Sequence, residues 1–151
     1  MKKSYYLFNP GRMSRKDNTF KFTSIDDQGI FKIIEHTNKG IAYQEFISLT
    51  QKMPFSLVQW ASILRISRRT LERIRDEKKT IEPPYSEQVI RVVMLYNYGV
   101  IVFGSAKKFN QWLTIASLPL GNVAPQALLN NSYGVEAVKN ELGRIEHGIF
   151  A

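Results

Sequence analysis

Residues 57–76 read LVQWASILRISRRTLERIRD, and their spacing predicts two short helices joined by a tight turn. Apolar residues three and four positions apart share one helical face. They are Leu57, Trp60, Ala61 and Leu64 in the first helix and Ile66, Leu71 and Ile74 in the second. Ser67 is placed to cap the second helix by accepting a hydrogen bond from a backbone N–H near Thr70. The pattern indicates a helix-turn-helix, and at its turn Arg65 takes the position that commonly carries Gly, where a left-handed backbone costs about 1 kcal/mol.

The second predicted helix presents a row of arginines on its outer side. A basic helix held in this way fits the major groove of DNA. The candidate DNA-binding residues are Ser67, Arg68, Arg69, Thr70, Arg73 and Lys79. The alternative is that these cations pair with Glu72, Asp76 or Glu77 on the same helix and make no contact with phosphate.

The net charge of +8 is unevenly distributed along the chain. Residues 1–80 contain 16 Lys and Arg against 8 Asp and Glu, whereas residues 81–151 contain 5 of each sign. This asymmetry favours a polyanionic partner for the first half and a protein partner or a dimer contact for the second. A merely solvated basic face would give the same charge count.

Length and composition indicate a folded protein without disulfides, a signal peptide or a membrane span. With 151 residues the chain is long enough to bury roughly 70% of its unfolded surface, as one domain or two small ones. It contains no Cys, which excludes disulfides and thiolate metal sites and fits a reducing compartment. The first residues, MKKSYYLFNPGR, lack the apolar run of a signal peptide, and no window approaches the roughly 18 apolar residues of a membrane span. We therefore expect a cytoplasmic protein.

Helical spacing recurs outside the helix-turn-helix. It predicts helices from Ser24 to about Asn38 and from about Ala42 to Lys52, and later ones at 85–103, at 106 to about 115, near Pro125, and at 135–145. The helix at 85–103 is apolar around much of its circumference, so we expect it to be sandwiched between other elements. With no confident strand, the fold is predicted to be all-α. We expect a weakly structured basic arm at 1–23, a helix-turn-helix domain at 24–98 and a small helical domain at 99–151.

The chain lacks the motifs of catalysis. His36 and His147 are its only histidines and are too far apart in sequence to suggest a local metal pair. No Gly-rich phosphate loop, serine elbow or H-E-x-x-H motif is present, so we expect no enzyme activity, no cofactor and no metal. The last three residues, Ile149, Phe150 and Ala151, are apolar, whereas chain ends are more often polar and frayed. We therefore expect another surface to cover them.

From about Gly40 to Ala151 the sequence resembles the antitoxins of RES-Xre toxin–antitoxin systems, whose C-terminal module is the Xre/MbcA/ParS toxin-binding domain. The resemblance rests on residues that are specific in this order: Ile66-Ser67, Arg69-Thr70-Leu71, Tyr85-Ser86-Glu87, Val102-Phe103-Gly104, Trp112-Leu113, Leu120-Gly121, Pro125, Leu128-Leu129, Gly134, Val138, Leu142 and Arg144-Ile145-Glu146-His147-Gly148. The family pattern commonly has a second Gly where this chain has Asn122.

The resemblance implies a protein that binds a RES-domain toxin, an enzyme that consumes NAD, and blocks its active site. In that family the last helix and the tail face the toxin, which here implies Leu142, Ile145, Glu146, His147, Gly148, Ile149, Phe150 and Ala151. It also implies a homodimer that forms a hetero-oligomer with the toxin and represses its own operon by binding operator DNA. We expect Trp112, Leu128 and Val138 to pack in the protein's own core.

A second function stays open on the sequence alone. The chain could be a dimeric helix-turn-helix transcriptional regulator whose C-terminal module binds another protein or a small ligand. An adjacent reading frame for a RES-type toxin would favour the antitoxin.

Overall fold

The computed structural model of the chain describes residues 27–148. The helices and strands, in chain order, are α1 (Asp27–Lys39), β1 (Ile41–Ala42), α2 (Tyr43–Thr50), α3 (Leu57–Leu64), α4 (Arg68–Asp76), β2 (Thr80–Ile81), α5 (Tyr85–Phe103), α6 (Ala106–Thr114), the 3-10 helices η1 (Leu118–Leu120) and η2 (Pro125–Leu128), and α7 (Ser132–Glu146). The predictions for the arm at 1–23, the helix start at Ser24 and the three terminal residues lie outside the described part. Within it, the predicted helical fold is confirmed.

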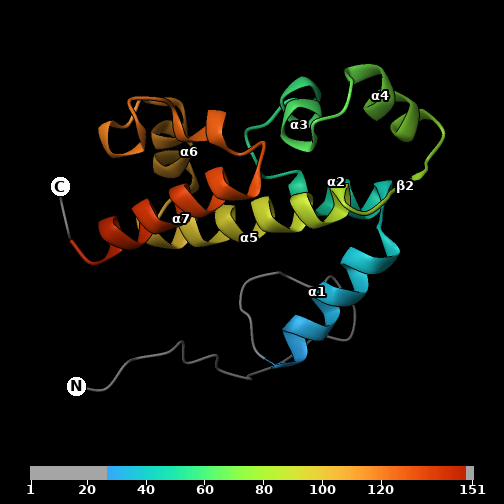
Figure 1. The fold of residues 1–151 in the computed structure, drawn as a ribbon, viewed down its shortest axis with the longest axis horizontal. Helices are drawn as coiled ribbons and strands as arrows, with labels where there is room; N and C mark the ends of the chain where they lie inside the picture. Colours follow the sequence, from blue (N-terminus) through green and yellow to red (C-terminus); the bar gives the residue numbers. More distant parts are fainter. Residues whose placement is uncertain (1–26, 149–151) are drawn as a thin grey trace.

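The long helix α5 is the centre of the molecule (Figure 1). It packs against α1, α2, α3, α6 and α7, which confirms that it is sandwiched. Val89 and Ile90 on this helix are buried in the core, as are Phe109 of α6 and Leu113. Gly99 lets α6 approach closely, since a Cβ at this position would lie 2.2 Å from Cζ of Phe109. One helix therefore supplies core residues to both halves of the chain.

Helix α7 lies alongside α5 and runs in the same direction (Figure 1). At the start of the pair, Nε2 of Gln88 donates a hydrogen bond to the carbonyl oxygen of Leu129 at 2.6 Å. At its end, the hydroxyl of Tyr98 donates to Oε2 of Glu146, also at 2.6 Å. These two contacts tie α7 to α5 near both of its ends.

Two short strands correct the expectation that the described part of the chain has no sheet. Strands β1 and β2 pair antiparallel, with Ile41 opposite Ile81 and Ala42 opposite Thr80. Gly40 precedes β1 with φ of 83°, and a Cβ there would lie 2.7 Å from the carbonyl oxygen of Ile81. A two-residue strand is too short to show a period of two in the sequence. The pairing joins the chain before α2 to the chain after α4.

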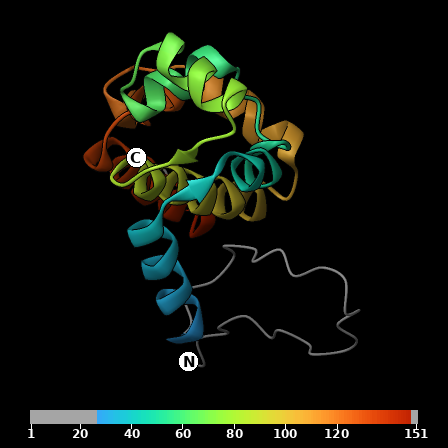
Figure 2. The same ribbon diagram turned by 90° about the vertical axis from the view of Figure 1, so that its right-hand side faces the viewer.

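Helix α1 projects from the body of the molecule (Figure 2). Its apolar side chains are only partly covered: Ile33 packs against the core, whereas Ile34 is exposed and Phe31 keeps 71% of its surface accessible. The helix ends at Lys39 before Gly40, close to the predicted end at about Asn38, and its predicted start at Ser24 lies outside the described residues. The predicted second helix, 42–52, is shorter in the structure, at Tyr43–Thr50.

No single helix within residues 27–148 is long and apolar enough to cross a membrane. Taken together, α5 and α6 have the length and composition of a membrane span, but the two helices are bent by 112° relative to each other.

At Gly134, near the start of α7, the backbone of η2 leaves no room for a side chain. A Cβ there would lie 1.8 Å from the carbonyl oxygen of Leu128, whereas at Gly143 on the same helix the only neighbour is the Tyr98 hydroxyl at 3.8 Å. We expect Gly134→Ala to lower the free energy of unfolding by about 2 to 3 kcal/mol through overpacking. The matched variant Gly143→Ala should raise it by about 0.5 to 1 kcal/mol, because alanine favours a helix interior. Urea denaturation measures both, and equal effects of the two changes would contradict the packing assigned to Gly134.

Candidate functional site

The helix-turn-helix predicted at residues 57–76 is present as α3 and α4. Ser56 begins α3 with a capping box, in which its side chain accepts from the N–H of Gln59 and the Gln59 side chain accepts from the Ser56 N–H. Ser67 caps α4 as predicted, its Oγ accepting from the N–H of Thr70 at 3.0 Å. Trp60, Ala61, Leu64 and Leu71 are buried together. The two helices are therefore held by local caps and by a shared core.

Arg65 occupies the turn between α3 and α4 in the left-handed region, with φ of 56° and ψ of 37°. The N–H of Arg65 donates to the carbonyl of Ser62, and the N–H of Ile66 donates to that of Ala61, both at 3.0 Å. This pair of bonds is a Schellman motif, whose left-handed position normally carries Gly. The strain expected at Arg65 from the sequence is thus present in the structure.

This geometry predicts that Arg65→Gly stabilises the fold. We expect its free energy of unfolding to rise by about 1 kcal/mol, since glycine adopts a left-handed backbone without a Cβ clash. Arg65→Ala is the control, because it removes the same charge and retains the strain. Urea denaturation of both variants separates the two causes, and an equal gain from alanine would assign the effect to charge.

Helix α4 presents its arginines to solvent at one end of the molecule (Figure 1). Leu71 is fully buried, and Arg69 and Arg73 lie two residues to either side of it, so both point away from the core. Within residues 29–148 neither guanidinium has a carboxylate partner. They are the two arginines of α4 that have no carboxylate partner among the described residues, and we call the solvent-facing side of α4 that carries them the basic face.

Three other cations on or near α4 each pair with a neighbouring carboxylate. Nε of Arg68 is 2.7 Å from a carboxylate oxygen of Glu72, and Lys79 pairs with Glu77. Nε of Arg75 donates to Asp76 at 2.9 Å, and this hydrogen bond, together with the charge of the carboxylate, raises the pKa of Arg75. Pairing with these carboxylates, one of the two alternatives drawn from the sequence, is therefore seen for Arg68 and Lys79 but not for Arg69 and Arg73. Exposed pairs of this kind are weak, so they reduce the positive charge locally without removing these side chains from solvent.

The residues expected to face a toxin are not all at the surface. Leu142 is fully buried in the core and offers a partner no surface, which corrects its place among the contact residues. Ile145 is half-buried, while Glu146, His147 and Gly148 are exposed at the C-terminal end of α7. Gly148 ends the helix with φ of 67°. Ile149, Phe150 and Ala151 lie outside the described residues. As expected, Val138 is buried, and Trp112 and Leu128 pack partly buried against the core.

Tyr98 is a residue that sequence reasoning missed. Its hydrogen bond to Glu146 fixes the carboxylate and the last turn of α7 against α5. The sequence carried no local signal for this contact, since the two residues are 48 positions apart. The C-terminal end of α7 and the basic face of α4 lie at opposite ends of the molecule (Figure 1). A partner at one end would leave the other accessible.

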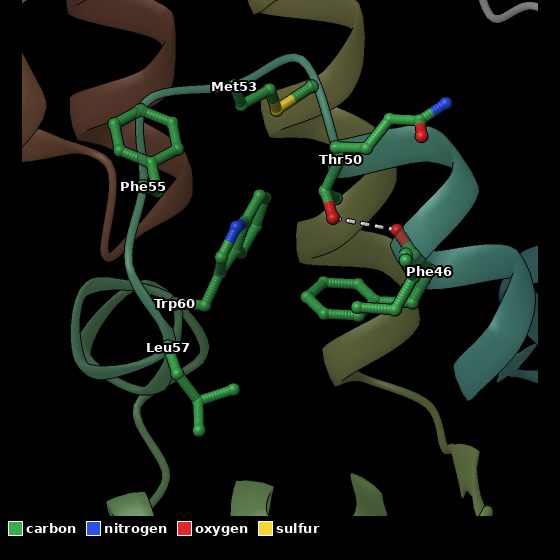
Figure 3. A pocket seen from close by; sticks show the side chains of 8 residues that line it. Phe46, Thr50, Met53, Phe55, Leu57 and Trp60 are labelled. Carbon is green, nitrogen blue, oxygen red and sulfur yellow. Dashed lines mark hydrogen bonds between the residues drawn. The ribbon is translucent and has the colours of Figure 1, made fainter.

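An apolar hollow of about 260 Å³ lies between α2 and α3 (Figure 3). Trp60 forms its wall and meets Phe46 and Phe55 edge to face, with ring centroids 5.2 and 5.7 Å apart. The hydroxyl of Thr50 already donates to the carbonyl of Phe46 at 2.8 Å, so it is committed within the protein. All the lining residues come from 46–60, so this hollow lies outside the C-terminal module to which the sequence alternative assigned a ligand.

A capped basic helix after a tight turn, joined through one long helix to a second helical unit, defines a two-part helix-turn-helix protein. Residues 32–94 match the antitoxin Xre-like helix-turn-helix domain, and residues 99–148 match the antitoxin Xre/MbcA/ParS C-terminal toxin-binding domain. The chain belongs to the Xre antitoxin family. It is therefore an antitoxin with a toxin-binding C-terminal domain, not an enzyme, and its partner is a cognate toxin.

Two relatives are similar over part of their length. An "Antitoxin Xre" of Yersinia enterocolitica is 32% identical over 105 residues, which cover 64% of this chain and 71% of the relative. An "Antitoxin Xre" of Photorhabdus laumondii subsp. laumondii is 37% identical over 65 residues, covering 42% of this chain and 44% of the relative. The match to the toxin-binding domain decides between the two functions left open by the sequence, in favour of the antitoxin.

Proposed function

We propose that this antitoxin neutralises a RES-domain toxin by covering its NAD-consuming active site with the C-terminal end of α7 and the tail that follows. The observation that carries the proposal is the match of residues 99–148 to a toxin-binding domain, with Glu146, His147 and Gly148 exposed where α7 ends. In the sequence, Ile149 and Phe150 follow Gly148 and carry two large apolar side chains. Buried against a toxin, such side chains would contribute strongly to affinity.

We propose further that the protein acts as a homodimer and represses its own operon. The repression is supported by Arg69 and Arg73, which face solvent on a capped helix without a carboxylate partner in the described residues, and the homodimer is what the family resemblance implies. The backbone N–H groups at the start of α4 add to the positive potential near Ser67 and Thr70. Because the two surfaces lie at opposite ends, toxin and operator DNA could be bound by one chain at the same time.

The proposal is tested by co-expressing the antitoxin with the RES-domain toxin and purifying through a tag on the toxin. A stable complex of defined mass, in which NAD consumption is suppressed in proportion to bound antitoxin, is the expected result. Light scattering on the complex and on the antitoxin alone gives both stoichiometries. Full toxin activity in the presence of a saturating, folded antitoxin would contradict the proposed mode of neutralisation.

A further inference from the structure

The connection between α6 and η2 carries apolar side chains in an unusual place. Residues 115–123, which we name the apolar turn, include the exposed side chains of Ile115, Leu118 and Val123. Leu118 keeps 84% of its surface accessible. Exposed turns are normally built from polar residues, and apolar side chains gathered on a monomer's surface mark interaction sites.

The apolar turn has a defined backbone structure. The N–H of Ser117 donates to the carbonyl of Val123 at 3.0 Å, and the N–H of Asn122 donates back to the carbonyl of Ser117 at 2.9 Å. Gly121 and Asn122 both adopt a left-handed backbone, with φ of 78° and 61°. Asparagine tolerates this region better than most residues, which explains how Asn122 replaces the glycine common in the family. The turn is thus held in one shape by its own hydrogen bonds.

One leucine anchors the turn and another points outward. Leu120 packs partly buried against the core, and η1 contacts α7. Leu118, two residues earlier in the same 3-10 helix, is the most exposed of Ile115, Leu118 and Val123. Because the backbone of the turn is already ordered, it loses little conformational entropy when a partner covers Leu118.

The position of the turn points to its partner. It lies within residues 99–148, the part of the chain that matches a toxin-binding domain, and η1 packs on α7. Along the longest axis of the molecule it is at the end where α7 terminates (Figure 1). A toxin that covers the C-terminal end of α7 would therefore reach the turn without leaving this end of the molecule.

We propose that the apolar turn is a second toxin contact, with Leu118 entering an apolar recess on the toxin surface beside the region covered by α7. The inference rests on the proposed function, because it assumes that the C-terminal domain binds a RES-domain toxin. It adds a contact on a rigid turn to the contact made by the helix end. Two separated anchors would fix the orientation of the toxin on the antitoxin.

The test is the affinity of the full-length antitoxin for purified RES-domain toxin carrying an inactivating substitution, measured by calorimetry. We expect Leu118→Asp to weaken binding by about 50-fold and Leu118→Ala by about 10-fold, since a buried leucine is replaced by a charge or by a methyl group. Both variants should keep the wild-type unfolding temperature. Tyr133→Asp is the matched control, because Tyr133 is 88% exposed in the same domain but lies on the first turn of α7.

The outcomes separate this inference from the proposed function. If the wild-type protein does not bind the RES-domain toxin, the proposed function fails. If the wild type binds and Leu118→Asp binds equally well, or if Tyr133→Asp weakens binding as much, only the assignment of the apolar turn fails. A change of oligomeric state in Leu118→Asp without a change in toxin affinity would also overturn it, since the turn would then be a contact between antitoxin copies.

Discussion

Deletion of residues 148–151 is expected to abolish protection of cells against the toxin. The deletion removes Ile149 and Phe150, whose burial against a partner would contribute about 4 kcal/mol together, or about three orders of magnitude in affinity. It also removes Gly148, which ends α7 in a left-handed conformation. Growth of cells expressing the toxin with full-length or truncated antitoxin measures the effect directly.

A control is needed because a truncated chain can fail for other reasons. Replacing residues 149–151 by Gly-Ser-Gly keeps the length of the chain and the helix end at Gly148 while removing the apolar side chains. We expect this variant to fail like the deletion, with an unchanged unfolding temperature, because Leu142 and Val138 hold α7 in the core independently of the tail. Full protection by either folded variant would show that the tail is not needed for neutralisation.

Operator binding should depend on Arg69 and Arg73 more than on the other cations of α4. If each contacts a phosphate, each alanine change lowers the slope of log affinity against log salt by about 0.9. The double change then lowers affinity at 0.15 M salt by about 30-fold, since two contacts contribute twice 0.9 times the logarithm of the inverse salt concentration. Fluorescence anisotropy with labelled operator DNA across a salt series measures both quantities.

The paired cations and a distant arginine supply the controls for that experiment. Arg68→Ala and Lys79→Ala should change the slope less, because each side chain already pairs with a neighbouring carboxylate. Arg91→Ala removes the same charge from α5, where the arginine pairs with Glu87, and should leave the slope unchanged. An equal reduction from Arg91→Ala would indicate a general charge effect, and an unchanged slope in the Arg69 and Arg73 variants would exclude their contact with phosphate.

The helix-turn-helix was predictable because its signals are local. Apolar spacing within eight or nine residues, the Ser67 cap and the position of Arg65 in the turn each involve residues within one or two helical turns of one another. The same holds for the ends of α5 at Tyr85 and Gly104. The structure reproduces these features closely, including the strain at Arg65.

The candidate site was only partly predictable, because no local sequence pattern shows which side chains pair with each other or which ones face the core. All the arginines of α4 read alike in the sequence, yet Arg68 pairs with Glu72 whereas Arg69 and Arg73 pair with no carboxylate among the described residues. The spacing of α7 could not tell that Leu142 faces the core completely. For the apolar turn, a signal existed in the residues LPLGN, where leucines stand in a segment that ends in turn formers. It did not reveal which leucine is anchored.

The amino-acid sequence by itself determined the helical class, the helix-turn-helix and its caps, and the concentration of positive charge in the first half of the chain. These properties follow from short-range spacing and composition. Only the tertiary structure decided that β1 pairs with β2 across the helix-turn-helix, that Tyr98 holds Glu146, and that Leu118 is exposed while Leu120 packs inward. The strand pairing and the Tyr98–Glu146 bond depend on contacts between residues distant in sequence, and the exposure of Leu118 depends on which side of the turn faces the core. The spacing of apolar residues along the sequence carries no information on either.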